Sequence, residues 1–335
     1  MGYISAFINV WKEMKEQKRY NQSFLLPYLA ELENKYNGQF EAEQRKKIVD
    51  YYGLFITSFL CSSYKRLYGK TLSENERKRA TLFGVLTPVG DDLFDIDKLS
   101  KEDIYTITFR PEEFIPTAFS GHVAKEIQTY LLNHVPHIDE YLQASADVLR
   151  AQIETEKQTS KSISQPELRR ITYTKGAVSV IIYHQCLDDT ASSAMLDALF
   201  YTGSLYQLGN DLFDLYKDTR DNIYTLVNTC NNYTLFRQQF MERVRIQNQK
   251  IMSLPYDAKR KKDFCIVMNT INARSLVAIN QFIRTQKKTG QAIDWWKLPR
   301  KSMIVDMENP VNFIKWLYYI YKLPKLLPNA SKAKL

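Results

Sequence analysis

The sequence predicts an all-α fold from its composition and its hydrophobic periodicity. Eleven glycines in 335 residues are about 3% of the chain, against a usual share of about 7%, and proline is sparse as well. Sandwiches, barrels and propellers need frequent glycine and proline turns, so this composition argues against them. Apolar residues recur at helical spacings over most of the chain, and the one strand candidate is the short segment 105–109 (YTITF).

The predicted helices begin and end at residues that normally start or stop helices. In the long stretch 41–68, for example, Val49, Leu54, Phe55 and Phe59 place apolar side chains at helical spacings. The predicted helices cover residues 3–17, 41–68, 73–95, 112–133, 137–157, 166–187, 192–218, 232–253, 257–286 and 308–322. The breaks coincide with Pro27, Asn37-Gly38, Ser73 as an N-cap, Pro111, Pro116, Pro136, Pro166, Pro255 and Pro299.

Nothing in the sequence divides the chain into separate domains. There is no repeat of fixed period, no low-complexity block and no long linker. We therefore expect a single helical domain over 1–335, with N-terminal helices (1–40), a catalytic core (41–286) and a C-terminal helix with a basic tail (287–335).

Several functional classes lack their usual signals. No G-x-G-x-x-G or G-x-x-x-x-G-K-[ST] motif is present, so Rossmann and P-loop nucleotide binding is not expected. No signal peptide or membrane span is evident, which predicts a cytoplasmic protein. The net charge of +9 suits nucleic acid, a lipid surface or an anionic substrate equally well. The cysteines and histidines form no metal-binding pattern and are expected to be structural; they are Cys61, Cys186, Cys230, Cys265, His122, His134, His137 and His184.

The first chemical signal is a cluster of three aspartates, Asp91, Asp92 and Asp95, in the segment DDLFD. On a helix Asp91 and Asp95 lie on one face, with Asp92 one step round. The preceding helix is largely apolar and contains Pro88, which predicts a kink just before the acids. Clustered carboxylates at such a place repel one another, and a divalent cation, most simply Mg²⁺, would offset that cost. A solvated acidic helix end is the alternative interpretation.

The second signal is a polar stripe in the segment NDLFDLYKD, again after an apolar helix. Asn210, Asp214 and Asp218 are spaced at i, i+4 and i+8, so they share one face over two turns. Two such stripes on separate helices can face each other and hold cations between them.

Together the two segments resemble the motifs of class I isoprenoid synthases, the terpene cyclases and trans-prenyltransferases. DDLFD is similar to the family's D-D-x-x-D motif. NDLFDLYKD is similar to the cyclase pattern N-D-[LI]-x-[ST]-x-x-x-E, including the lysine before its last acid, Lys217. The resemblance spans most of residues 40–285, is specific at the two motifs and is only architectural elsewhere.

The resemblance implies a terpenoid-synthase-like helical bundle around an apolar central pocket, with three Mg²⁺ ions at its mouth. Asp91 and Asp95, with Asp92 nearby, would hold two ions, and Asn210, Asp214 and Asp218 would hold the third. The ions and basic side chains would pull the diphosphate off an allylic carbon of a linear prenyl diphosphate.

This chain departs from the cyclase pattern at two positions. Asp214 replaces Ser or Thr, and Asp218 replaces Glu. Asp214 brings the segment closer to the second aspartate-rich motif of prenyltransferases, so chain elongation or head-to-head condensation stays open. Against elongation, no arginine pair follows Asp95, and Lys65, Arg66 and Lys70 resemble that family's isopentenyl diphosphate site only loosely.

Basic residues for a diphosphate are found in the segment RRITYTKGAVSV. By resemblance, Arg169 or Arg170 occupies the place of the cyclase pyrophosphate-sensing arginine, and Lys175 that of a prenyltransferase lysine at a helix break. Gly176 predicts a local bend there. Surface charges are the alternative interpretation for both arginines.

Carbocation chemistry must exclude water and is favoured by aromatic faces. Phe55, Phe59 and Phe83 are the expected pocket-wall residues, although most aromatic residues in a chain this size belong to the core.

The C-terminal segment 312–323 is apolar and aromatic with lysines, and it suits either a docked helix or a peripheral membrane contact. Nucleic acid is not an expected partner because basic and aromatic residues are not interleaved on any other predicted helix. The sequence leaves a homodimer open. A non-catalytic helical lipid-binding protein is the remaining alternative to an enzyme.

Overall fold

A computed structural model describes residues 2–95, 97–290 and 292–323, with the side chains of 2–4 and 95 left out. Within these ranges every regular element is helical, as predicted. None of these helices combines the length and the apolar character needed to cross a bilayer.

The chain divides into two compact units, and each is described by itself. Unit 1 comprises Met1–Ser145 and Ile182–Thr190, and unit 2 comprises Ala146–Ile181 and Ala191–Leu335. Helices α8 (Ile138–Glu154) and α9 (Gln165–Gln185) each contribute residues to both units. The expected single domain stays a prediction.

Unit 1 is built around the packing of a π-helical segment, η2, against α5. Its elements are α1 (Gly2–Tyr20), η1 (Asn21–Leu25), α2 (Leu26–Tyr36), α3 (Ala42–Lys46), η2 (Lys47–Cys61), α4 (Ser62–Tyr68), α5 (Glu74–Asp95), α6 (Lys101–Phe109), η3 (Pro111–Glu113) and α7 (Phe119–His134). Gly84 of α5 allows this close packing, because a Cβ there would lie 3.2 Å from the backbone carbonyl carbon of Tyr52. The predicted N-cap is confirmed: the Ser73 hydroxyl accepts from the Glu76 N–H, and the Glu76 carboxylate accepts from the Ser73 N–H.

The structure decides the strand candidate and corrects one predicted break in unit 1. The candidate 105–109 lies in α6 and not in a strand, because Ser100 caps the helix and Ile104 and Ile107 bury one helical face. The predicted break at Pro27 is wrong, because helical backbone continues from η1 into α2 and Pro27 lies in the first turn of α2.

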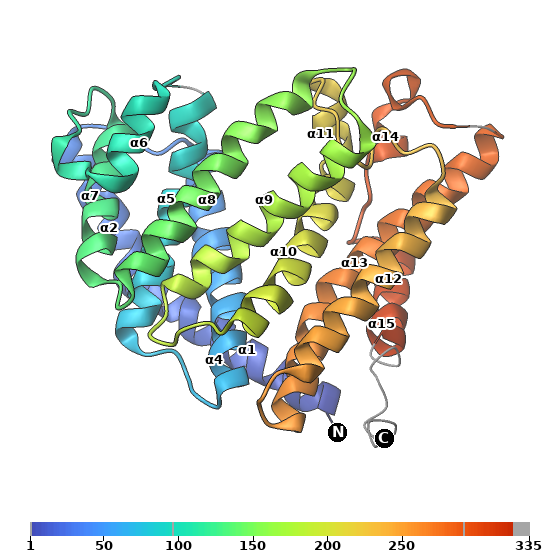
Figure 1. Cartoon of the computed structure of the whole chain (residues 1–335), viewed down its shortest axis with the longest axis horizontal. Coiled ribbons are helices and arrows are strands. Elements are labelled where there is room, and N and C mark those ends of the chain that lie inside the picture. Colours follow the sequence, from blue (N-terminus) through green and yellow to red (C-terminus); the bar gives the residue numbers. More distant parts are fainter. Residues whose placement is uncertain (1, 96, 291, 324–335) are drawn as a thin grey trace. The chain divides into compact units, whose positions relative to one another are not determined.

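Unit 2 is a set of long helices in which α10, α12 and α13 pack on one another and α15 packs on α13 (Figure 1). Its elements are η4 (Thr155–Thr159), most of α9, α10 (Ser193–Phe213), α11 (Leu215–Arg220), α12 (Tyr233–Ser253), α13 (Ala258–Thr289), η5 (Trp295–Lys297), α14 (Arg300–Met303) and α15 (Pro310–Lys322). The predicted helix over 192–218 divides at Asp214, which lies between α10 and α11 with φ −90° and ψ 4°.

A pair of glycines brings α9 and α10 together within unit 2. A Cβ on Gly176 would lie 2.1 Å from the Gly203 carbonyl oxygen, and a Cβ on Gly203 would meet Gly176 at the same distance. Helix α9 runs through Gly176 without a break. What this glycine provides is therefore backbone contact between two helices, which no larger residue permits.

We expect Gly176→Ala to destabilise the protein by about 2 kcal/mol or more, because the added methyl group must push α10 away. Urea denaturation followed by circular dichroism measures the change. Gly90→Ala in α5 is the matched control: a Cβ there has nothing within 4 Å, so we expect no loss and up to about 1 kcal/mol of gain. Equal effects of the two substitutions would refute the close helix contact.

Candidate functional site

The second acidic segment lies where α10 ends and α11 begins. Asn210 and Asp214 are exposed and Asp218 is half-buried, whereas Asp211 is buried with 6% of its surface exposed. The Asp214 N–H donates to the Asn210 carbonyl over 2.8 Å, and the Asp218 N–H to the Asp214 carbonyl over 2.9 Å. The backbone thus keeps a helical hydrogen-bond pattern through the joint.

The carboxylates that interact electrostatically here are Asp211, Asp214 and Asp218. Burial, together with the negative charges of Asp211 and Asp214, raises the pKa of Asp218 to about 8. Burial, together with the negative charge of Asp214, raises the pKa of Asp211 to about 6. Asp211 was not a predicted site residue, although its spacing to Asp214 and Asp218 (i, i+3, i+7) also defines a helix face.

Asp211 has one satisfied and one unsatisfied oxygen. Its Oδ1 accepts a hydrogen bond of 2.8 Å from the Gln207 amide. The Thr172 hydroxyl on α9 lies close enough to lower the pKa of Asp211, but its geometry does not make it a hydrogen-bond partner. Oδ2 is therefore buried without a hydrogen bond to the described residues, a costly state for a carboxylate.

Lys175 is the predicted basic residue that the structure brings to these acids. It lies half-buried on α9, and its positive charge lowers the pKa of both Asp211 and Asp218. The contact between Gly176 and Gly203 holds this part of α9 against α10. Lys217 is exposed, and its charge lowers the pKa of Asp218.

The two predicted arginines have other surroundings. Arg170 is exposed and ion-paired with Glu154 and, at 3.2 Å, with Glu167. Arg169 is exposed, and its charge, together with burial as the larger cause, lowers the pKa of Arg243 on α12. No hydrogen bond or ion pair among those found in the described residues connects either arginine to Asp211 or Asp218.

Arg243 lies beside an open cavity of about 390 Å³ in unit 2, lined by Tyr173, Gln238, Gln239, Glu242, Arg243 and Ile246. Its guanidinium carbon is 3.6 Å from the centre of the Tyr173 ring, and Nη2 donates to the Ser204 hydroxyl over 2.6 Å. These contacts connect α12 with α9 and α10, which is a structural role.

The first acidic segment lies in unit 1, at the C-terminal end of α5. Asp91 is exposed, and Asp92 is half-buried and accepts a hydrogen bond from the Gln44 amide. The side chain of Asp95 lies outside the described residues. Helix α5 has no basic residue in its last turn. Carboxylates at this end are therefore repelled by the negative end of the helix dipole.

The predicted wall aromatics all lie in unit 1. Phe55 stacks on Phe59 with ring centroids 4.9 Å apart, and Phe83 meets Tyr183 edge-on at 4.9 Å. Phe59 and Phe83 are buried and Phe55 is half-buried. Their packing is that of core residues. Lys65, from the loose resemblance to prenyltransferases, is buried in ion pairs with Glu76 (2.5 Å) and Asp189.

The aspartates of both segments suit a hard divalent cation, because such ions bind carboxylate oxygens. Within the described ranges no three His, Cys, Asp or Glu side chains stand close enough to hold a metal ion by themselves. Mg²⁺ does not need such a cage, because it keeps several waters and binds through one or two carboxylates plus substrate phosphates. The unsatisfied Oδ2 of Asp211 is a suitable oxygen donor.

This chain matches no protein-family model and no curated protein. The interpretation of the acidic segments therefore rests on their own residues and on the resemblance of the two motifs.

The raised pKa values predict a characteristic pH dependence of stability. An aspartate whose pKa is about 4 in the unfolded chain and about 8 in the folded one binds its proton more tightly when folded. The folded protein therefore loses stability as the pH rises from about 4 to about 8. We expect Asp218→Asn to remove part of this loss, so that in EDTA the variant is about 1–3 kcal/mol more stable than wild type at pH 8 and equally stable at pH 4.

Urea denaturation at pH 4, 6 and 8 measures this effect. Asp221→Asn is the matched control, because Asp221 lies three residues away but the Arg220 guanidinium holds its pKa below the usual value. This substitution should give no gain at pH 8. If the free energy of unfolding depends on pH in the same way for wild type and Asp218→Asn, burial does not raise the pKa of Asp218.

Proposed function

We propose that the chain is a Mg²⁺-dependent class I terpene synthase that ionises a linear prenyl diphosphate and releases diphosphate to form a terpene. One observation carries the proposal. One acidic segment lies at the C-terminal end of α5, which has no basic residue in its last turn, and the other lies at the joint of α10 and α11 and contains a buried, unsatisfied carboxylate oxygen. Both places favour a bound cation on physical grounds.

Each functional residue would then have a distinct role. Asp91, Asp92 and Asp95 would hold two ions, and the third would bind at Asp214, Asp218 and either Asn210 or Asp211. Mg²⁺ supplies charge neutralisation of the departing diphosphate. Lys175 and Lys217 would bind diphosphate oxygens directly, with Arg169 and Arg170 as the predicted additional cations. An apolar pocket, for which Phe55, Phe59 and Phe83 stay the candidates, would exclude water from the cation.

We expect Asp218→Asn and Asp91→Ala each to lower turnover at least about 100-fold, because each removes a carboxylate that would hold Mg²⁺ against the leaving diphosphate. The assay incubates the protein with C10, C15, C20 and C25 prenyl diphosphates and Mg²⁺, and mass spectrometry identifies the products. Asp221→Asn is the control and should keep wild-type turnover. Turnover that survives both Asp218→Asn and Asp91→Ala in folded protein would exclude these acids from the reaction.

A prenyltransferase is the second candidate, and the grouping of Asp211 with Asp214 and Asp218 supports it. Asp211 and Asp214, in the order N-D-x-x-D, are closer to a prenyltransferase's second aspartate-rich motif than is the set Asn210, Asp214 and Asp218. Product analysis with and without isopentenyl diphosphate separates the candidates. A cyclase forms hydrocarbons or alcohols from one allylic diphosphate alone, whereas elongation consumes isopentenyl diphosphate. Absence of any product with all substrates would favour a non-catalytic role.

A further inference from the structure

Helix α15 exposes an apolar face that no described part of the chain covers. Its outward side chains range from 46% exposed at Phe313 to 65% at Ile314. Four of them, Val311, Ile314, Tyr318 and Tyr321, recur at i, i+3, i+7 and i+10, and Phe313 and Leu317 lie beside these. We call these six residues the α15 apolar face. Contiguous exposed apolar surface of this kind usually marks an interaction site.

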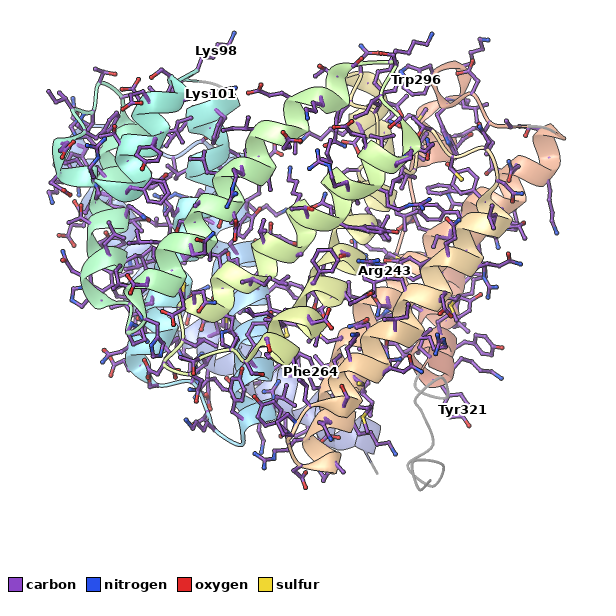
Figure 2. The ribbon with its side chains drawn as sticks, in the orientation of Figure 1. Lys98, Lys101, Arg243, Phe264, Trp296 and Tyr321 are labelled. Carbon is purple, nitrogen blue, oxygen red and sulfur yellow. The ribbon has the colours of Figure 1, made fainter. Side chains whose placement is uncertain are left out.

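The opposite side of α15 is firmly docked, so the outward face has a defined orientation. Ile320 and Leu323 are buried at 4% and 1% exposure. The Trp316 indole N–H donates to the Thr270 carbonyl over 2.8 Å, and the Asn280 amide donates to the Tyr319 hydroxyl over 3.0 Å. Both partners lie on α13, beside which α15 runs in Figure 1. Figure 2 shows Tyr321 pointing away from the helices of this unit.

Positive charge lies on and beside α15. Helix α15 contains Lys315 and Lys322 and no acidic residue. Lys315 lies near Arg284 of α13, whose charge, together with burial as the larger cause, lowers the pKa of Lys315. Lys322 lies 5.4 Å from the centre of the Tyr318 ring.

This charge is concentrated in the last part of the sequence. Residues 284–335 contain eleven Lys and Arg against three Asp and Glu, a difference of eight in a chain whose net charge is +9. The acids closest to α15 in sequence precede it. Asp306 among them already accepts from the backbone N–H groups of Glu308 and Asn309.

We propose that the α15 apolar face, with Lys315, Lys322 and Arg284, is a docking surface for an anionic lipid bilayer. The apolar side chains would enter the acyl boundary, and the lysines would contact anionic headgroups, as in other interfacial helices. Tyr318 and Tyr321 combine an apolar ring with a polar tip, which suits the headgroup level. A second copy of the chain is a poorer occupant, because it would bring lysines against lysines with no acids on this face to compensate. The inference is independent of the proposed activity.

Co-sedimentation of the full chain with vesicles tests the proposal. We expect binding to vesicles of phosphatidylcholine and phosphatidylserine at low salt, and much weaker binding to pure phosphatidylcholine or at high salt. Ile314→Ser combined with Leu317→Ser should weaken partitioning about tenfold or more, since both apolar side chains leave the bilayer. Lys315→Gln combined with Lys322→Gln should also weaken it about 30-fold, from about 1 kcal/mol per lysine.

Ile115→Ser combined with Leu235→Ser is the matched control, because both residues are exposed apolar side chains that do not belong to α15. It should leave vesicle binding unchanged. Circular dichroism and thermal melts show that each variant is folded, and light scattering gives its oligomeric state. Equal vesicle binding by wild type and both α15 variants would overturn the proposal. So would a wild-type dimer that fails to bind vesicles and is dissociated by Ile314→Ser with Leu317→Ser, because a second copy would then cover the face.

Discussion

The candidate site depends on one constraint: unit 2 buries carboxylates without enough cations to match them. Asp211 and Asp218 both have raised pKa values because of burial and of repulsion by neighbouring aspartates, and Lys175 opposes this effect at both positions. Lys175 can do so because α9 contacts α10 directly at Gly176 and Gly203. The backbone contact and the electrostatics are therefore coupled, since separating the helices would remove the nearest cation from a buried acid.

Carboxylates in unit 1 also lie in an electrostatically unfavourable place, but the cause is the helix dipole and not burial. Asp91 and Asp92 are not deeply buried, but they lie at the negative end of α5, which has no basic residue in its last turn. Sites that bind charged ligands commonly retain such unfavourable arrangements, because the ligand relieves them and a more stable replacement would not bind. An arrangement selected for stability alone would place Lys or Arg in the last turn of α5.

Much of the fold was predictable from the sequence, whereas the residues that form the candidate site were only partly predictable. Helical periodicity and capping residues such as Ser73 act locally, so they can be recognised without tertiary information. Asp211 was missed because the i, i+4, i+8 rule selects the face that begins at Asn210, whereas packing of α10 buries the neighbouring face. Residues 105–109 alternate like a strand, but the cap at Ser100 and the burial of two isoleucines outweigh that pattern. Nothing local could show that Arg170 would pair with Glu154.

The C-terminal helix shows why net charge alone says little about function. The sequence admits either a helix docked on the bundle or an interfacial helix, and α15 has the residues for both, because one side packs on α13 and the other is exposed. Unit 2 thus has an acidic segment at the joint of α10 and α11 and a basic, apolar surface at α15. The excess positive charge of the chain lies almost entirely in residues 284–335 of the sequence. An overall charge of +9 therefore describes the C-terminal part of the sequence, whereas the candidate site requires cations of its own.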